Sequence, residues 1–134
     1  MQALIAPLRE LADFEEVQKK CKKDTGILQL AGCVNSQKTH MMYALSDGFD
    51  FKIIATSSEM KAKQIYEEYR FLDSDIYQYP AKDLLFYQAD LRGKYLLKQR
   101  MEVFQAILER RGVTIVTSFD GFMDALLPLD MMRE

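Results

Sequence analysis

The sequence predicts an α/β domain with a mostly parallel sheet. Short apolar segments alternate with amphipathic segments along most of the 134 residues, and one loop between a predicted strand and a predicted helix nearly has the spacing of a phosphate loop. Strands separated by helices pair in parallel, because the helix returns the chain to the same end of the sheet. We expect a single domain over residues 1–134. Four strands leave an open edge, so we also expect this domain to be a fragment of a much longer multidomain protein.

Capping and turn residues mark where the predicted elements begin and end. Asp13 with Glu16 introduces the first predicted helix and Thr56 with Glu59 a later one, since a short polar side chain can satisfy free N–H groups of a first turn. Glycine-containing turns separate the helices from the strands. The predicted helices cover residues 14–23, 38–45, the segment after Thr56, residues 94–111 and a last helix from Ser118 to Pro128; the predicted strands cover residues 27–31, 51–55, 75–79 and 113–117.

The helix over residues 94–111 has the clearest periodicity. Leu97, Met101, Phe104 and Leu108 recur at spacings of 4, 3 and 4 residues, with polar residues largely on the opposite side. This pattern is typical of an amphipathic helix.

Residues 32–39 resemble the phosphate-loop pattern, except that Gln37 stands where the second glycine is expected. In a working loop, backbone N–H groups cradle the phosphates, the lysine reaches the β and γ oxygens and the Ser/Thr hydroxyl holds Mg²⁺. A side chain at the glycine position obstructs the approach of the backbone to the phosphates. We therefore interpret Gly32, Gln37, Lys38 and Thr39 as a vestigial nucleotide-binding loop. Lys38 and Thr39 are candidates for a residual anion contact, or they simply begin a solvated helix.

The sequence does not complete a catalytic set. Nucleotide hydrolysis by such a site needs an acid at the end of a neighbouring apolar strand, and Asp120 follows the strand over residues 113–117 only after two other residues. Cys21 and Cys33 lack the spacing of a zinc-binding pair. We therefore predict no catalytic residue and no metal site in this fragment.

The charge of the chain argues against a general affinity for nucleic acid. Its net charge is −2 and its pI is about 5.5. Two local basic runs are candidate phosphate or partner contacts, or else solvated helix faces: Lys19, Lys20, Lys22 and Lys23, and Arg92, Lys94, Lys98 and Arg100. The sequence shows no membrane-length apolar run and no signal-peptide pattern, so we expect a cytoplasmic location and no membrane partner.

Several segments, taken in order, resemble the N-terminal, excinuclease-subunit-B-like region of bacterial transcription-repair coupling factor. They are residues 28–32 before the altered loop, the Tyr77-Gln78-Tyr79-Pro80-Ala81 turn, the long helix with Arg100, and residues 108–116 leading to Leu126-Leu127-Pro128. The resemblance implies a partial RecA-like (P-loop NTPase-like) three-layer domain. It also implies that the P-loop is degenerate and that the domain has lost its ATPase role. The domain would then serve as a scaffold in the repair of DNA damage by nucleotide excision repair.

The same resemblance implies which partners and cofactors belong to the parent protein. This fragment is expected to be no enzyme and to need no cofactor, whereas the parent would use ATP and Mg²⁺ as a DNA translocase through segments not present here. The other domains of the same chain are the expected direct partners. UvrA would bind an adjacent domain that begins beyond Pro128, and RNA polymerase and DNA would bind downstream segments.

Two alternatives stay open. The first is the nucleotide-binding part of an active excinuclease-B or helicase-type ATPase. Excinuclease B keeps the glycine at the position of Gln37 and carries a long aromatic hairpin, for which only residues 81–93 are present here. The second alternative is an unrelated small α/β binding domain.

Overall fold

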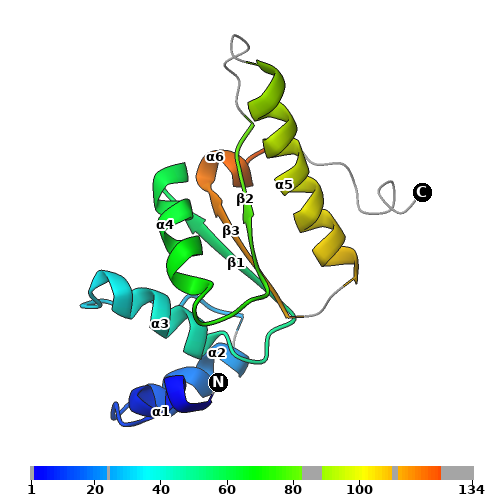
Figure 1. The fold of residues 1–134 in the computed structure, drawn as a ribbon. Helices are drawn as coiled ribbons and strands as arrows, with labels where there is room; N and C mark the ends of the chain where they lie inside the picture. Colours follow the sequence, from blue (N-terminus) through cyan, green and yellow to red (C-terminus); the bar gives the residue numbers. More distant parts are fainter. Residues whose placement is uncertain (1, 24, 83–88, 110–111, 125–134) are drawn as a thin grey trace.

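The computed structural model describes residues 2–23, 25–82, 89–109 and 112–124, and a three-stranded parallel sheet lies at its centre (Figure 1). The strands are β1 (Phe51–Thr56), β2 (Ile76–Tyr79) and β3 (Val113–Ser118), in the spatial order β1-β3-β2. Ile115 of β3 lies opposite Ile53 on one side and Tyr77 on the other. The prediction of a mixed α/β domain with a parallel sheet is confirmed.

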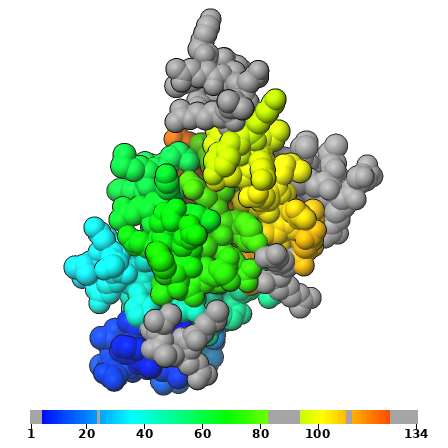
Figure 2. Space-filling view, in the orientation of Figure 1, coloured from blue at the N-terminus to red at the C-terminus, as the bar shows by residue number. Residues whose placement is uncertain are grey.

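The described helices lie on both sides of this sheet. They are α1 (Gln2–Arg9), α2 (Phe14–Lys23), α3 (Asn35–Leu45), α4 (Glu59–Tyr69), α5 (Ala89–Glu109) and α6 (Phe119–Phe122). α4 covers one side and α5 the other, while α1 and α2 gather at the end of the molecule next to α3 (Figures 1 and 2). Among the described helices, none has the length and apolar content needed to cross a bilayer.

The predicted helix boundaries agree closely in some places and differ in others. α2 spans the predicted residues, whereas α3 begins at Asn35 and α5 at Ala89, both earlier than predicted. α6 has four residues, and the predicted closure of that helix at Pro128 lies outside the described residues.

β3 is the centre of the hydrophobic core, because all six of its residues are buried. Val116 faces the α3 and α4 side, where it belongs to a cluster with Tyr69 and Ile76. Val113 and Ile115 face the other side, where they pack with the α5 residue Val103 and its neighbour Ala106. A parallel strand covered by helices on both faces is expected to be buried in this way.

The strand predicted over residues 27–31 is wrong, and the sheet has three described strands instead of four. Residues 27–31 form no ladder, Ile27 is fully exposed, and Leu28 and Leu30 are each 44% exposed. A strand depends on a neighbour that accepts its ladder and on a face that buries its side chains. The outer edges of β1 and β2 pair with no described strand, and residues 27–31 join neither of them, so local apolar content alone does not produce a strand there.

The predicted cap of α4 is displaced by two residues. Ser58 is the N-cap, since its side chain accepts a hydrogen bond from the Lys61 N–H. The Thr56 hydroxyl instead donates to the backbone carbonyls of Ser58 and Thr117. Thr56 therefore links β1 to β3 and does not cap the helix.

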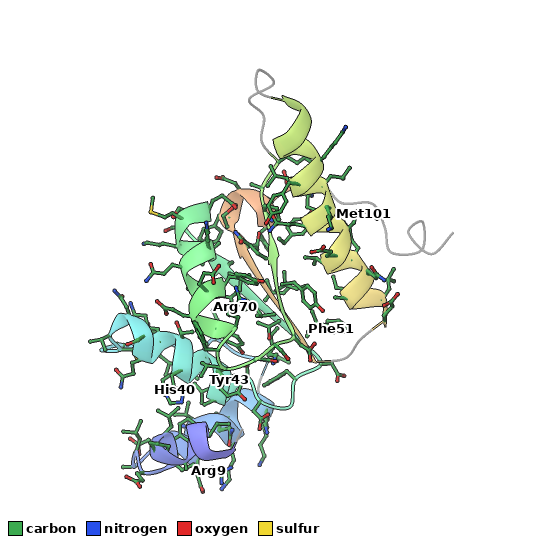
Figure 3. All side chains as sticks on the ribbon, in the orientation of Figure 1. Arg9, His40, Tyr43, Phe51, Arg70 and Met101 are labelled. Carbon is green, nitrogen blue, oxygen red and sulfur yellow. The ribbon has the colours of Figure 1, made fainter. Side chains whose placement is uncertain are left out.

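One face of β1 stays open. Phe51 and Ile53 are 51% and 58% exposed, although their register partners Val113 and Ile115 are buried under α5. Figure 3 shows Phe51 on the α5 side of the sheet. α5 packs on β2 and β3, so it does not extend over β1.

Replacing the fully buried Tyr69 tests the α4 side of the core. Its ring packs edge-on against Tyr43 with centroids 5.7 Å apart. We expect Tyr69→Ala to lower the free energy of unfolding by about 3–5 kcal/mol, because truncating a buried aromatic side chain leaves a cavity. Urea denaturation measures this, and the matched control is Phe71→Ala, since Phe71 is 83% exposed. Equal losses for the two variants would contradict the packing described here.

Candidate functional site

The predicted loop borders an open hollow of about 460 Å³ between α3, α4 and the carboxyl end of β1. Lys38 and Thr39 line it, as the phosphate-loop pattern predicts for a binding site. Lys61 and Glu68 of α4 line it as well, and the sequence analysis did not single them out. Ligands of open α/β sheets bind beyond the carboxyl ends of the strands, so the hollow is the candidate site.

Gly32 has the backbone conformation for which glycine is suited. Its φ angle is +81°, in the left-handed region that side chains with a Cβ rarely adopt. The space around a hypothetical Cβ is open, so the requirement comes from the backbone and not from crowding. The first glycine of the loop pattern therefore has a structural reason.

The Gln37 side chain accepts a hydrogen bond from one of the loop's backbone N–H groups. Its Oε1 accepts a hydrogen bond from the Val34 N–H, with N and O 3.3 Å apart. Val34 directly precedes α3, and N–H groups at a helix start are the donors that hold a phosphate in a working loop. The steric argument from the sequence missed this contact. The signal was present, because glutamine at the third helical position often reaches back in this way.

Thr39 is also engaged inside the protein. Its side chain is buried, and its hydroxyl donates to Glu68 Oε2 at 2.7 Å. Gln64 donates to the other oxygen of the same carboxylate at 3.0 Å. The hydroxyl that would hold Mg²⁺ in a working loop thus ties α3 to α4.

The charges around the hollow are mixed. Lys38 and Lys61 are exposed and form no ion pair with a described residue. Glu68 places a carboxylate on the same wall. The two lysines attract an anion and Glu68 opposes it, so the site is weaker in positive charge than its lysines suggest.

Arg100, a predicted phosphate or partner contact, lies inside the protein. Only 7% of it is exposed, and its Nη1 donates to the Pro80 carbonyl at 3.0 Å and to Asp124 Oδ2 at 2.6 Å. The guanidinium also lies over the Tyr79 ring, 4.3 Å from its centroid. Arg100 therefore joins α5 to the end of β2 and to the residues after α6.

The other predicted cations of that run lie differently. Lys94 and Lys98 are exposed, and Lys98 approaches Glu102 to 3.9 Å. The side chain of Arg92 lies outside the described residues. Arg100 is thus separated from the exposed Lys94 and Lys98 by its burial.

The structure places an acid, Glu59, at the ends of the strands, where the sequence analysis found none. Glu59 Oε1 accepts a hydrogen bond from the Ser118 hydroxyl and another from the Ala81 N–H at 3.2 Å. The Ser118 hydroxyl in turn accepts a hydrogen bond from the Gly121 N–H. Gly121 leaves no room for a side chain, because a Cβ there would lie 2.5 Å from the Thr117 hydroxyl oxygen. These contacts hold the carboxyl edge of the sheet together.

In the part of the chain that the structure describes, no group of three acidic, histidine or cysteine side chains could hold a metal.

The Arg100–Asp124 pair predicts a pH-dependent stability. Burial raises the pKa of Asp124, but the hydrogen bonds from Arg100 and the Lys82 N–H, with the positive charge of Arg100, outweigh burial and hold this pKa below its usual value. A carboxyl with a lowered folded-state pKa stabilises the protein above its unfolded pKa of about 4 and loses that contribution as pH falls through the folded pKa. We expect Asp124→Asn to lower the free energy of unfolding at pH 7, and this loss to shrink below about pH 4. Urea denaturation from pH 7 to pH 3 measures it, with the exposed Asp120→Asn as control. A loss independent of pH would contradict the ion pair.

Comparisons with known proteins add no family to this geometry. Searches against family models, curated proteins and solved structures returned no significant match in any of the three. The likeness to the coupling factor and its RecA-like fold therefore stays an expectation from the sequence. The function has to be argued from the residues of the candidate site.

Proposed function

We propose that this domain is a non-hydrolysing scaffold of a transcription-repair coupling factor acting in nucleotide excision repair, with a degenerate phosphate loop. The observation that carries the proposal is the Gln37 side chain, whose oxygen occupies the Val34 N–H. The Thr39–Glu68 hydrogen bond supports it, because it engages the hydroxyl that Mg²⁺ would need. The domain is therefore proposed to have no catalytic residue and no cofactor of its own.

A nucleotide would have to displace both internal contacts. A neutral hydrogen bond contributes about 0.5–1.5 kcal/mol and one to a charged group about 1.5–3 kcal/mol. Losing both amounts to roughly 2–4.5 kcal/mol, which is about a thirtyfold to two-thousandfold loss of affinity. Internal satisfaction of the loop is thus sufficient to weaken Mg·ATP binding severely.

The proposed role is to support neighbouring domains of the same parent chain. A sheet buried on both sides of β3 is a rigid body suited to that role. In this proposal, UvrA binds through an adjacent domain, and RNA polymerase and DNA bind downstream segments. ATP and Mg²⁺ belong to the translocase segments of the parent.

A second candidate is an active nucleotide-binding domain of the excinuclease-B or helicase type. The observation that favours it is the hollow with Lys38 and Lys61 at the carboxyl end of β1. The two candidates differ in affinity, because an active site must bind Mg·ATP without rearranging Gln37 and Thr39.

Substitution of Gln37 tests the proposal directly. We expect no saturable micromolar binding of a fluorescent Mg·ATP analogue to the unmodified chain. Gln37→Gly is expected to tighten binding about tenfold, because it frees the Val34 N–H and removes the side chain from the loop. Fluorescence anisotropy measures the affinity, and circular dichroism confirms that the variant is folded.

The matched control is Gln37→Glu, which keeps an oxygen acceptor for the Val34 N–H. It should give no gain in affinity. Saturable micromolar binding with hydrolysis by the unmodified chain would favour the active ATPase instead. No gain for Gln37→Gly would show that the contact to Val34 is not what keeps nucleotide out.

A further inference from the structure

A second hollow, of about 540 Å³, lies between α3 and the carboxyl-terminal half of α4. It adjoins the candidate site, because Thr39, Gln64 and Glu68 line both hollows. Its volume falls within the range of about 300–1,000 Å³ that ligand sites span. Phe71, which follows α4, also lines it, so we call it the Phe71 hollow.

The apolar wall of the Phe71 hollow carries an exposed aromatic ring. Phe71 is 83% exposed, and the half-buried Leu72 lines the hollow with it. The face of an aromatic ring is its negative side and attracts cations. The wall therefore suits a ligand that is cationic at one end and apolar along its length.

The charge that lines the Phe71 hollow is negative. Glu67 and Glu68 line it, and among the described residues no lysine or arginine does. Glu67 already has a cation, since its Oε2 lies 3.1 Å from Arg70 Nη1. Glu68 forms no ion pair with a described residue, and its hydrogen bonds come from the neutral groups of Thr39 and Gln64. A cationic ligand would neutralise the charge of Glu68.

The two hydrogen bonds also fix the orientation of the Glu68 carboxylate. Thr39 donates to Oε2 at 2.7 Å and Gln64 to Oε1 at 3.0 Å. Each carboxylate oxygen has two lone pairs, so each can accept one further bond. A carboxylate held in this way suits a guanidinium, which donates two parallel bonds and stacks on aromatic rings, whereas an ammonium is a point charge.

We propose that the Phe71 hollow binds an arginine side chain presented by a partner protein. The guanidinium donates to Glu68 and lies against the Phe71 ring, and the methylene groups of the arginine pack on Leu72. Free arginine is disfavoured, because no lysine or arginine among the described residues of the hollow would hold its α-carboxylate. The proposal goes beyond the proposed function, since it does not require the phosphate loop to bind or to exclude a nucleotide.

An NMR titration of the isotope-labelled chain tests the ligand without any substitution. The probes are Nα-acetylarginine amide, its neutral near-isostere Nα-acetylcitrulline amide, Nα-acetyllysine amide and free arginine. We expect saturable shift changes at the Phe71 amide and the Gln64 side-chain amide with the arginine probe. The citrulline probe should bind about tenfold more weakly or worse, because it lacks the charge, and the lysine probe about threefold more weakly or worse.

Two variants test the contact residues. Glu68→Gln should weaken binding of the arginine probe about tenfold or more, because a neutral amide of similar shape replaces the carboxylate. Phe71→Leu should weaken it about two- to fivefold, because it keeps apolar bulk and removes the ring face. The matched control is Glu102→Gln, which removes an exposed acid of α5 outside the hollow and should leave the affinity unchanged. Circular dichroism confirms that each variant is folded.

Several outcomes would overturn the proposal. They are no saturable binding of the arginine probe, equal affinity for the citrulline or the lysine probe, and an affinity that neither Glu68→Gln nor Phe71→Leu changes. Tighter binding of free arginine than of the blocked form would overturn it as well, because that result indicates a small-molecule ligand and not a protein side chain.

Discussion

β3 is paired along both edges and covered on both faces, and the positions of the neighbouring strands and helices follow from this. A central parallel strand has to satisfy its backbone through two neighbours, and β1 and β2 supply both ladders. Its polar residues are buried too, and buried polar groups usually have hydrogen-bond partners. Among the described residues, the Thr114 hydroxyl has none. Ser118 finds Glu59 and Gly121, and these bonds fix where α4 and α6 begin beyond the strand ends.

The loop over residues 32–39 therefore has different surroundings from those of a working phosphate loop. The segment before the loop is not a strand of the sheet, although Leu30 and Cys33 still reach the hollow at the end of β1. The polar groups of the loop have partners inside the protein. The Val34 N–H at the start of α3 donates to Gln37, and the Thr39 hydroxyl donates to Glu68. A site whose polar groups are already paired gains less from a ligand than one whose donors are free.

α5 shows how a charged residue can occupy the inner side of a helix while apolar residues stay outside. The guanidinium of Arg100 has a carbonyl, a carboxylate and an aromatic face as partners, so its burial is compensated at the edge of the sheet. With Arg100, Val103 and Ala106 turned inward, Leu97 and Met101 have to lie on the flank. The exposure of Leu97 and Met101 is thus a consequence of how α5 is rotated on the sheet.

The sequence predicted the α/β class, most helices and the strands around residues 51–55, 75–79 and 113–117, because hydrophobic periodicity and turn residues are local signals. It also marked Gly32, Gln37, Lys38 and Thr39 as one loop. It did not predict that residues 27–31 pair with no described strand, that Arg100 is buried, or that Glu59 and Glu68 contact Ser118 and Thr39. These features depend on which partner is within reach in space, and spacing along the chain carries no information about a contact that joins residues 29 or 59 positions apart.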